Sequence, residues 1–86
     1  MSETDKTAQR ILAINSLWLE TMMVDYDLRQ VDLVRECGIN KMQLSQFLTG
    51  KKDLPPSRKF TLFYFFKTLA MERQIRMMKE GNDFEY

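Results

Sequence analysis

The side chains that could do chemistry in this chain favour recognition over catalysis. The 86 residues include no His and a single Cys, which excludes imidazole catalysis, imidazole metal ligands, an internal disulfide and a zinc cluster built from thiolates. Amides and amines are instead concentrated between Gln30 and Lys52. These groups bind a partner through hydrogen bonds and charge. A chain of 86 residues with three Gly also leaves little room for a substrate pocket of roughly 300 Å³ or more, so we expect neither an enzyme nor a metal ion or organic cofactor.

The charge is unevenly distributed, although the net charge is only +1. Residues 1–28 carry two basic and five acidic side chains, residues 29–59 carry seven basic and three acidic, and residues 60–86 carry four of each. The middle third is therefore a basic segment inside a neutral chain, and it is the segment in which we expect the functional residues.

Gly and Pro residues divide the chain into blocks with apolar residues at helical spacing. These blocks predict helices over residues 7–24, 29–37, 41–48 and 57–80, with a kink or split near residues 69–70 left open. The aromatic run at residues 60–66 would also suit a strand. We read it as helix, and expect an all-α fold of four or five helices forming one domain over residues 1–86.

The location that we expect is cytoplasmic. No segment approaches the roughly 20 consecutive apolar residues of a membrane span, and residues 1–5 do not resemble a secretory signal. No membrane partner or small-molecule substrate is evident from the sequence.

A short turn joins the two central helices, and each of its residues has a mechanical role. Gly38 stands where a left-handed residue ends a helix, and Asn40 is a good N-cap for the next helix. Ile39 lies between them and is expected to fill the angle between the helices. Leu44 and Phe47 follow the cap by four and seven residues, which predicts that they press the second helix onto the core.

This order of elements from Gln30 to Gly50 resembles the helix-turn-helix of the Cro/repressor-type (lambda repressor-like) family of phage and bacterial transcription regulators. The resemblance covers about residues 28–69, because the family's basic loop is matched at residues 49–52 and its Leu- and aromatic-rich helix follows. Two positions depart from the family pattern. Val34 stands where Ala is usual, and Cys37 stands where Leu is usual.

The resemblance implies a sequence-specific regulator that binds double-stranded DNA as a small dimeric repressor, with the helix at residues 41–48 in the major groove of an operator. Amide and amine side chains can bond to adenine and guanine edges, and a thioether can contact a thymine methyl. The implied base contacts are Lys41, Met42, Gln43 and Gln46. The implied phosphate contacts are Gln30, Asn40, Ser45, Lys51, Lys52, Arg58 and Lys59.

Five aromatic residues within positions 60–66 surround their helix, so one face cannot bury all of them. We therefore predict a homodimer whose interface includes Phe60, Phe63, Tyr64, Met71, Ile75 and Met78. The alternative is that all the rings pack within one chain.

A second class of function also fits the composition. The low net charge, the acidic first third and the aromatic surplus are compatible with a protein-interaction module on the same scaffold, of the antitoxin or anti-repressor type.

Overall fold

The computed structural model describes residues 3–83, which form five α-helices and no strand. The helices are α1 (Glu3–Leu12), α2 (Ser16–Asp25), α3 (Gln30–Cys37), α4 (Lys41–Leu48) and α5 (Pro56–Asp83). The all-α fold predicted from the sequence is confirmed for this part of the chain. None of these helices combines the length and the apolar character needed to cross a bilayer.

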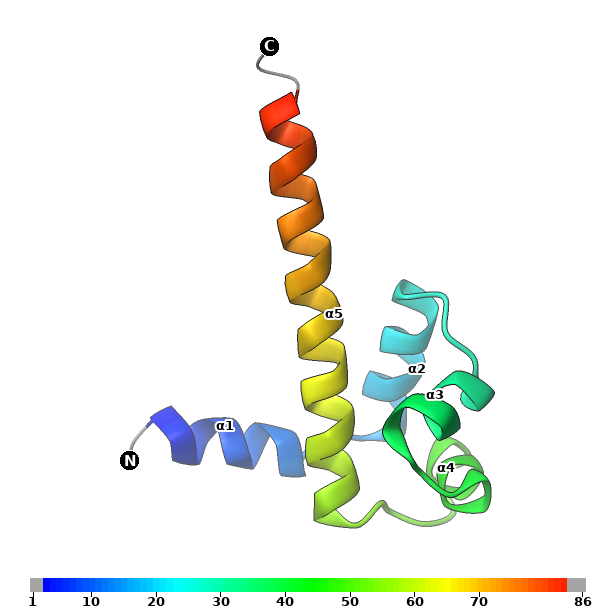
Figure 1. Ribbon diagram of the computed structural model, residues 1–86. Helices are drawn as coiled ribbons and strands as arrows, with labels where there is room; N and C mark the ends of the chain where they lie inside the picture. The colour runs from blue at the N-terminus through cyan, green and yellow to red at the C-terminus, as the bar shows by residue number, and fades with distance from the viewer. Residues whose placement is uncertain (1–2, 84–86) are drawn as a thin grey trace.

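The helices are arranged around the first half of α5 (Figure 1). α1 and α3 both pack against α5, and α4 packs against α2 and α3. In Figure 1, α1 lies on one side of the base of α5 and the group α2 to α4 lies on the other side. The last turns of α5 extend beyond all four of the other helices.

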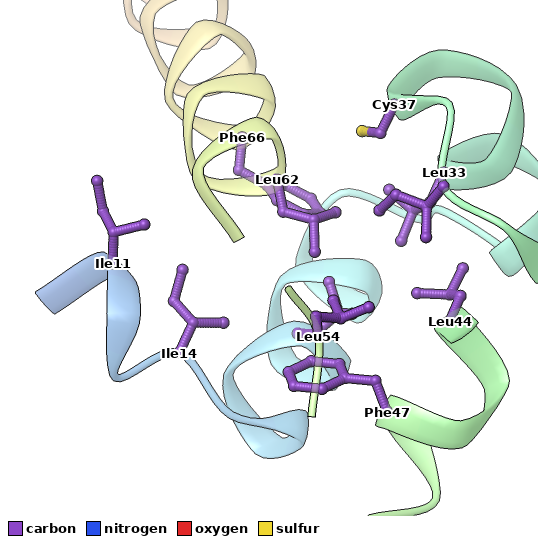
Figure 2. Close-up of a cluster of buried hydrophobic side chains, with 11 residues drawn as sticks. Ile11, Ile14, Leu33, Cys37, Leu44, Phe47, Leu54, Leu62 and Phe66 are labelled. Atoms are coloured by element: carbon purple, nitrogen blue, oxygen red, sulfur yellow. The ribbon is translucent and has the colours of Figure 1, made fainter. Parts of the chain in front are cut away.

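One apolar core joins the five helices (Figure 2). Each helix contributes at least one buried side chain to it, and the connecting segments contribute three more. The buried set is Ile11, Ile14, Leu19, Leu33, Cys37, Ile39, Leu44, Phe47, Leu54, Leu62 and Phe66. Full burial of one such side chain stabilises the fold by about 1.5–3 kcal/mol, so α3 and α4 are held firmly on the rest of the domain.

The prediction of a single helix over residues 7–24 is wrong, because the chain breaks after Leu12. The Asn15 side chain caps a new helix by accepting a hydrogen bond from the Trp18 N–H at 2.9 Å. Ile11 before the break, Ile14 within it and Leu19 after it are all buried. Two separate helices can bury these residues against different neighbours, which one straight helix could not do.

α5 is longer and more regular than predicted. It begins at Pro56, whose fixed φ suits a first helical residue, and continues without a break through Gly81 to Asp83. The predicted end of this helix at residue 80 is therefore wrong, and the described chain has no split near residues 69–70.

Most of the aromatic residues of α5 are covered within one chain, so a second copy is not needed to bury them. Phe66 is buried, and Phe60, Phe63 and Phe65 are half-buried against the core. Tyr64, by contrast, remains 51% exposed. α1 packs against α5 as a separate helix, which the single helix predicted over residues 7–24 did not foresee.

Candidate nucleic-acid interface

The turn between α3 and α4 has the geometry that its sequence predicts. Gly38 adopts a left-handed conformation, with φ +65°, and its N–H donates to the Val34 carbonyl at 3.1 Å. Ile39 is 1% exposed and fills the angle between the helices. The Asn40 side chain accepts hydrogen bonds from the N–H groups of Met42 at 2.8 Å and Gln43 at 3.3 Å. The start of α4 is therefore fixed by both packing and capping.

α4 has one buried and one exposed face. Leu44 and Phe47 are 0% and 4% exposed and anchor the helix in the core. The predicted recognition residues lie on the remaining surface: Lys41, Met42, Gln43 and Ser45 are exposed and Gln46 is half-buried. A helix held in this way presents its polar side chains without having to order itself on binding.

The segment after α4 folds back over the end of that helix. The N–H groups of Lys51 and Lys52 both donate to the Gln46 carbonyl, at 2.8 and 3.3 Å, while Gly50 takes a φ of +77°. Thr49 Oγ1 donates to the carbonyls of Ser45 and Gln46. This loop brings two exposed lysines next to the outer face of α4.

A shallow hollow of about 410 Å³ lies between α4 and the loop. Its lining brings together two amides of α4 and one lysine of the loop, all three of which the sequence predicted as site residues. The full lining is Gln43, Gln46, Lys52, Asp53, Leu54 and Pro55.

Lys59 does not belong to this surface, contrary to the prediction that it contacts phosphate. Its side chain is 7% exposed, and its ammonium donates to the Leu12 carbonyl at 2.8 Å and to Asp53 Oδ2 at 3.0 Å. The sequence held a signal for this, because Lys59 precedes Leu62 and Phe66 by three and seven residues and so shares their core-facing side.

The ion pair with Lys59 also bears on the charge of the hollow. The hydrogen bond from the Lys59 ammonium lowers the pKa of Asp53, against a smaller opposing effect of burial. The lowered pKa keeps the Asp53 carboxylate ionised at neutral pH. Its negative charge is offset by the buried ammonium of Lys59. This arrangement reduces the repulsion that the carboxylate would exert on an anion bound at the hollow.

The cations on the outer surface are available for such an anion. Lys41, Lys51 and Lys52 are exposed, and within residues 6–79 none of their ammonium groups takes part in an ion pair. Arg58, also predicted to contact phosphate, lies half-buried in the first turn of α5.

Gln30 is the predicted phosphate contact with the least favourable surroundings. It is exposed at the start of α3 and lines a hollow of about 670 Å³ with Thr49, but Glu20 and Asp27 line the same hollow. The two carboxylates disfavour an anion there. Arg29, the exposed N-cap residue of α3, was not among the predicted contacts, although its place directly before Gln30 was visible in the sequence.

Comparisons of the chain with protein-family models, with curated proteins and with solved structures find no match. The function proposed below therefore rests on the geometry of α3, the turn, α4 and the basic loop.

Proposed function

We propose that this protein is a sequence-specific transcription regulator that binds double-stranded DNA and inserts α4 into the major groove of an operator. The observation that carries the proposal is the division of α4 into an anchored face and a polar outer face. An α-helix with its side chains is about 10–12 Å across, and the major groove is about 12 Å wide. α4 therefore has both the size and the anchoring that groove insertion requires.

The side chains on α4 supply the chemistry for reading base edges. The amides of Gln43 and Gln46 can pair with adenine, the Lys41 ammonium can reach guanine acceptors, and Met42, 68% exposed, can contact a thymine methyl. Such contacts discriminate between sequences, each by about 1–3 kcal/mol. Occupying an operator in this way would block polymerase, which makes repression the effect that we propose.

The loop supplies the contacts that do not depend on sequence. Lys51 and Lys52 follow α4 directly and lie exposed beside it, where the phosphates bordering the groove would pass. Each phosphate that a lysine neutralises releases counterions, so these residues govern affinity and its salt dependence. Base reading by α4 and phosphate binding by the loop can therefore be tested separately.

The test begins with selection of bound duplexes from a random pool, followed by titration of the selected and a random duplex at several salt concentrations. Gln43→Ala should weaken binding to the selected duplex by about 5- to 150-fold and leave the random duplex nearly unchanged. Lys52→Ala should weaken both alike and reduce the salt slope by about one. Gln74→Ala and Lys6→Ala change exposed residues far from α4 in sequence and serve as matched controls.

Two results would contradict the proposal. One is failure of the pool to yield any preferred sequence together with no binding to duplex DNA at low salt. The other is a loss on Gln43→Ala that is equal for the selected and the random duplex, since a base-reading residue must discriminate between them.

A further inference from the structure

The second half of α5 lacks cover in the described chain. Every residue from 70 to 79 is exposed, and Figure 1 shows the last turns of the helix extending beyond the other four. Its last contact with the body is Arg73, which pairs with Asp25 at 3.3 Å and stacks over the Tyr26 ring at 4.0 Å. A helix in a protein gains most of its stability from packing. Contact with another helix would therefore stabilise this segment.

One face of α5 carries the apolar residues that such a partner would cover. We call Tyr64, Met71, Ile75 and Met78 the α5 stripe; their exposed fractions are 51%, 55%, 52% and 63%. Successive members are separated by seven, four and three residues, which places them on one side of a helix. This side is opposite the buried Leu62 and Phe66.

The α5 stripe is narrower than the interface predicted from the sequence. Phe60 and Phe63 were included in that prediction, but both pack against the core of their own chain. The remaining residues keep the alternating spacing of three and four that forms the seam between two packed helices. The surface is therefore suited to another helix that lies along α5.

Charged residues beside the α5 stripe indicate which helix packs against it. Glu72 and Lys79 are seven residues apart, so they lie on the same side of the seam, on either side of Ile75 along the helix axis. When two identical helices pack antiparallel, each flank meets the same flank of the other helix. Glu72 of one copy then faces Lys79 of the second copy, and the two-fold axis repeats the contact.

We infer that a second copy of this chain packs antiparallel along the α5 stripe, crossing it near Ile75. In this arrangement Met71, Ile75 and Met78 of both copies form one apolar seam, and the Glu72 and Lys79 side chains pair on its flank. The surface matches a second copy of itself in both its apolar and its charged positions. Binding to an unrelated helix would not require such a match.

The arrangement has a consequence that, unlike the dimer itself, rests on the proposed function. Leu62 in the core and Ile75 at the crossing are 13 residues apart, or about 20 Å along a helix. The two bodies would therefore lie about 40 Å apart along the shared direction, a spacing of the same order as the ~34 Å of one DNA turn.

Sedimentation equilibrium of the full chain at micromolar concentration, without DNA, tests the dimer. The wild-type mass should be near twice the 10.3 kDa of one chain. Met78→Glu should weaken dimerisation by at least about tenfold, because it places a charge in the seam. Met77→Glu is the matched control, since Met77 has the same 63% exposure but lies off the stripe. Circular dichroism should show equal helix content in both variants.

A wild-type mass of 10.3 kDa over the whole micromolar range would overturn the inference, and so would equal weakening by Met77→Glu and Met78→Glu. Because DNA is absent from this experiment, its failure leaves the proposed function standing, and failure of the DNA selection leaves the dimer standing.

Charge exchange tests the antiparallel direction. Glu72→Lys and Lys79→Glu should each weaken the dimer by about three- to tenfold, and the combined variant should recover most of the loss. In a parallel pair Glu72 would face Lys67 of the second copy instead. The combined variant would then stay as weak as Glu72→Lys alone, and that result would overturn the antiparallel arrangement.

Discussion

Replacement of Lys59 by Met tests whether this buried lysine fastens the base of α5 to the elements around it. The substitution removes the ammonium and keeps an unbranched apolar side chain. The wild-type ammonium joins three segments, because it donates to the Leu12 carbonyl at the end of α1 and to Asp53 in the loop after α4. We expect Lys59→Met to weaken the attachment of both segments to α5.

The magnitude follows from the two contacts. A hydrogen bond to a charged group stabilises a protein by about 1.5–3 kcal/mol, and the contact with the Leu12 carbonyl at 2.8 Å is of this kind. The pair with Asp53 adds at most about 1 kcal/mol, because the Asp53 side chain is 70% exposed. Relief from burying the ammonium offsets part of the loss. We therefore expect a net destabilisation of about 1–3 kcal/mol.

Urea unfolding at pH 7, followed by circular dichroism, measures this loss. With a slope of about 1 kcal/mol per molar urea for a small domain, the midpoint should fall by about 1–3 M. Asp53→Asn is the control that removes only the ion pair, and it should cost less than about 1 kcal/mol. An unchanged midpoint for Lys59→Met would refute the expectation, since it would mean that the two contacts together give no net stabilisation over an apolar side chain.

The pH dependence provides a second readout. The pKa of Asp53 is lowered in the folded state, mainly by the hydrogen bond from Lys59. The stabilisation from this group is therefore fully present above its ordinary pKa of 3.8 and is lost as the pH falls through the lower folded value. The gap in stability between wild type and Lys59→Met should consequently narrow below about pH 4.

Three further predictions concern α3, α4 and the turn between them. Leu44→Ala removes a side chain that is 0% exposed and should cost about 3–5 kcal/mol in urea unfolding, whereas Met42→Ala, at a position 68% exposed, should cost less than about 0.5 kcal/mol. Asn40→Ala deletes the cap of α4 and should cost about 1 kcal/mol by the same measurement, with Asn40→Gly costing less. Burial raises the pKa of Cys37 to about 11, with a smaller contribution from the nearby Glu36 charge. At pH 8 a disulfide reagent should therefore label the native chain far more slowly than the urea-unfolded chain. Equal labelling rates would contradict the burial of this thiol.

The local elements of the candidate site were predictable because their signals are short-range. Gly38 and Asn40 each determine the backbone within a few residues, so the C-terminal end of α3 and the start of α4 could be placed from sequence. The break before Asn15 was not predicted, because apolar spacing alone cannot distinguish one long helix from two shorter ones that pack on different neighbours.

The surroundings of the site were less predictable, since they depend on contacts between distant segments. Lys59 and Leu12 are 47 residues apart in the chain, and no local pattern links them. The acidic residues that share a hollow with Gln30 come from α2 and from the turn after it. A charge count along the sequence shows neither arrangement, because it does not show which side chains meet.

Because α5 is one unbroken helix, its length also determines the direction in which its exposed apolar face points. Each residue added to or removed from such a rod shifts its far end by about 1.5 Å and rotates it by about 100°. Seven added residues near position 69 would lengthen the rod by about 10 Å and present nearly the same side, whereas two would turn the apolar side almost to the rear. A change of length there would thus keep the face that α5 now displays only if it is close to a whole number of helical turns, such as about 7 or about 11 residues.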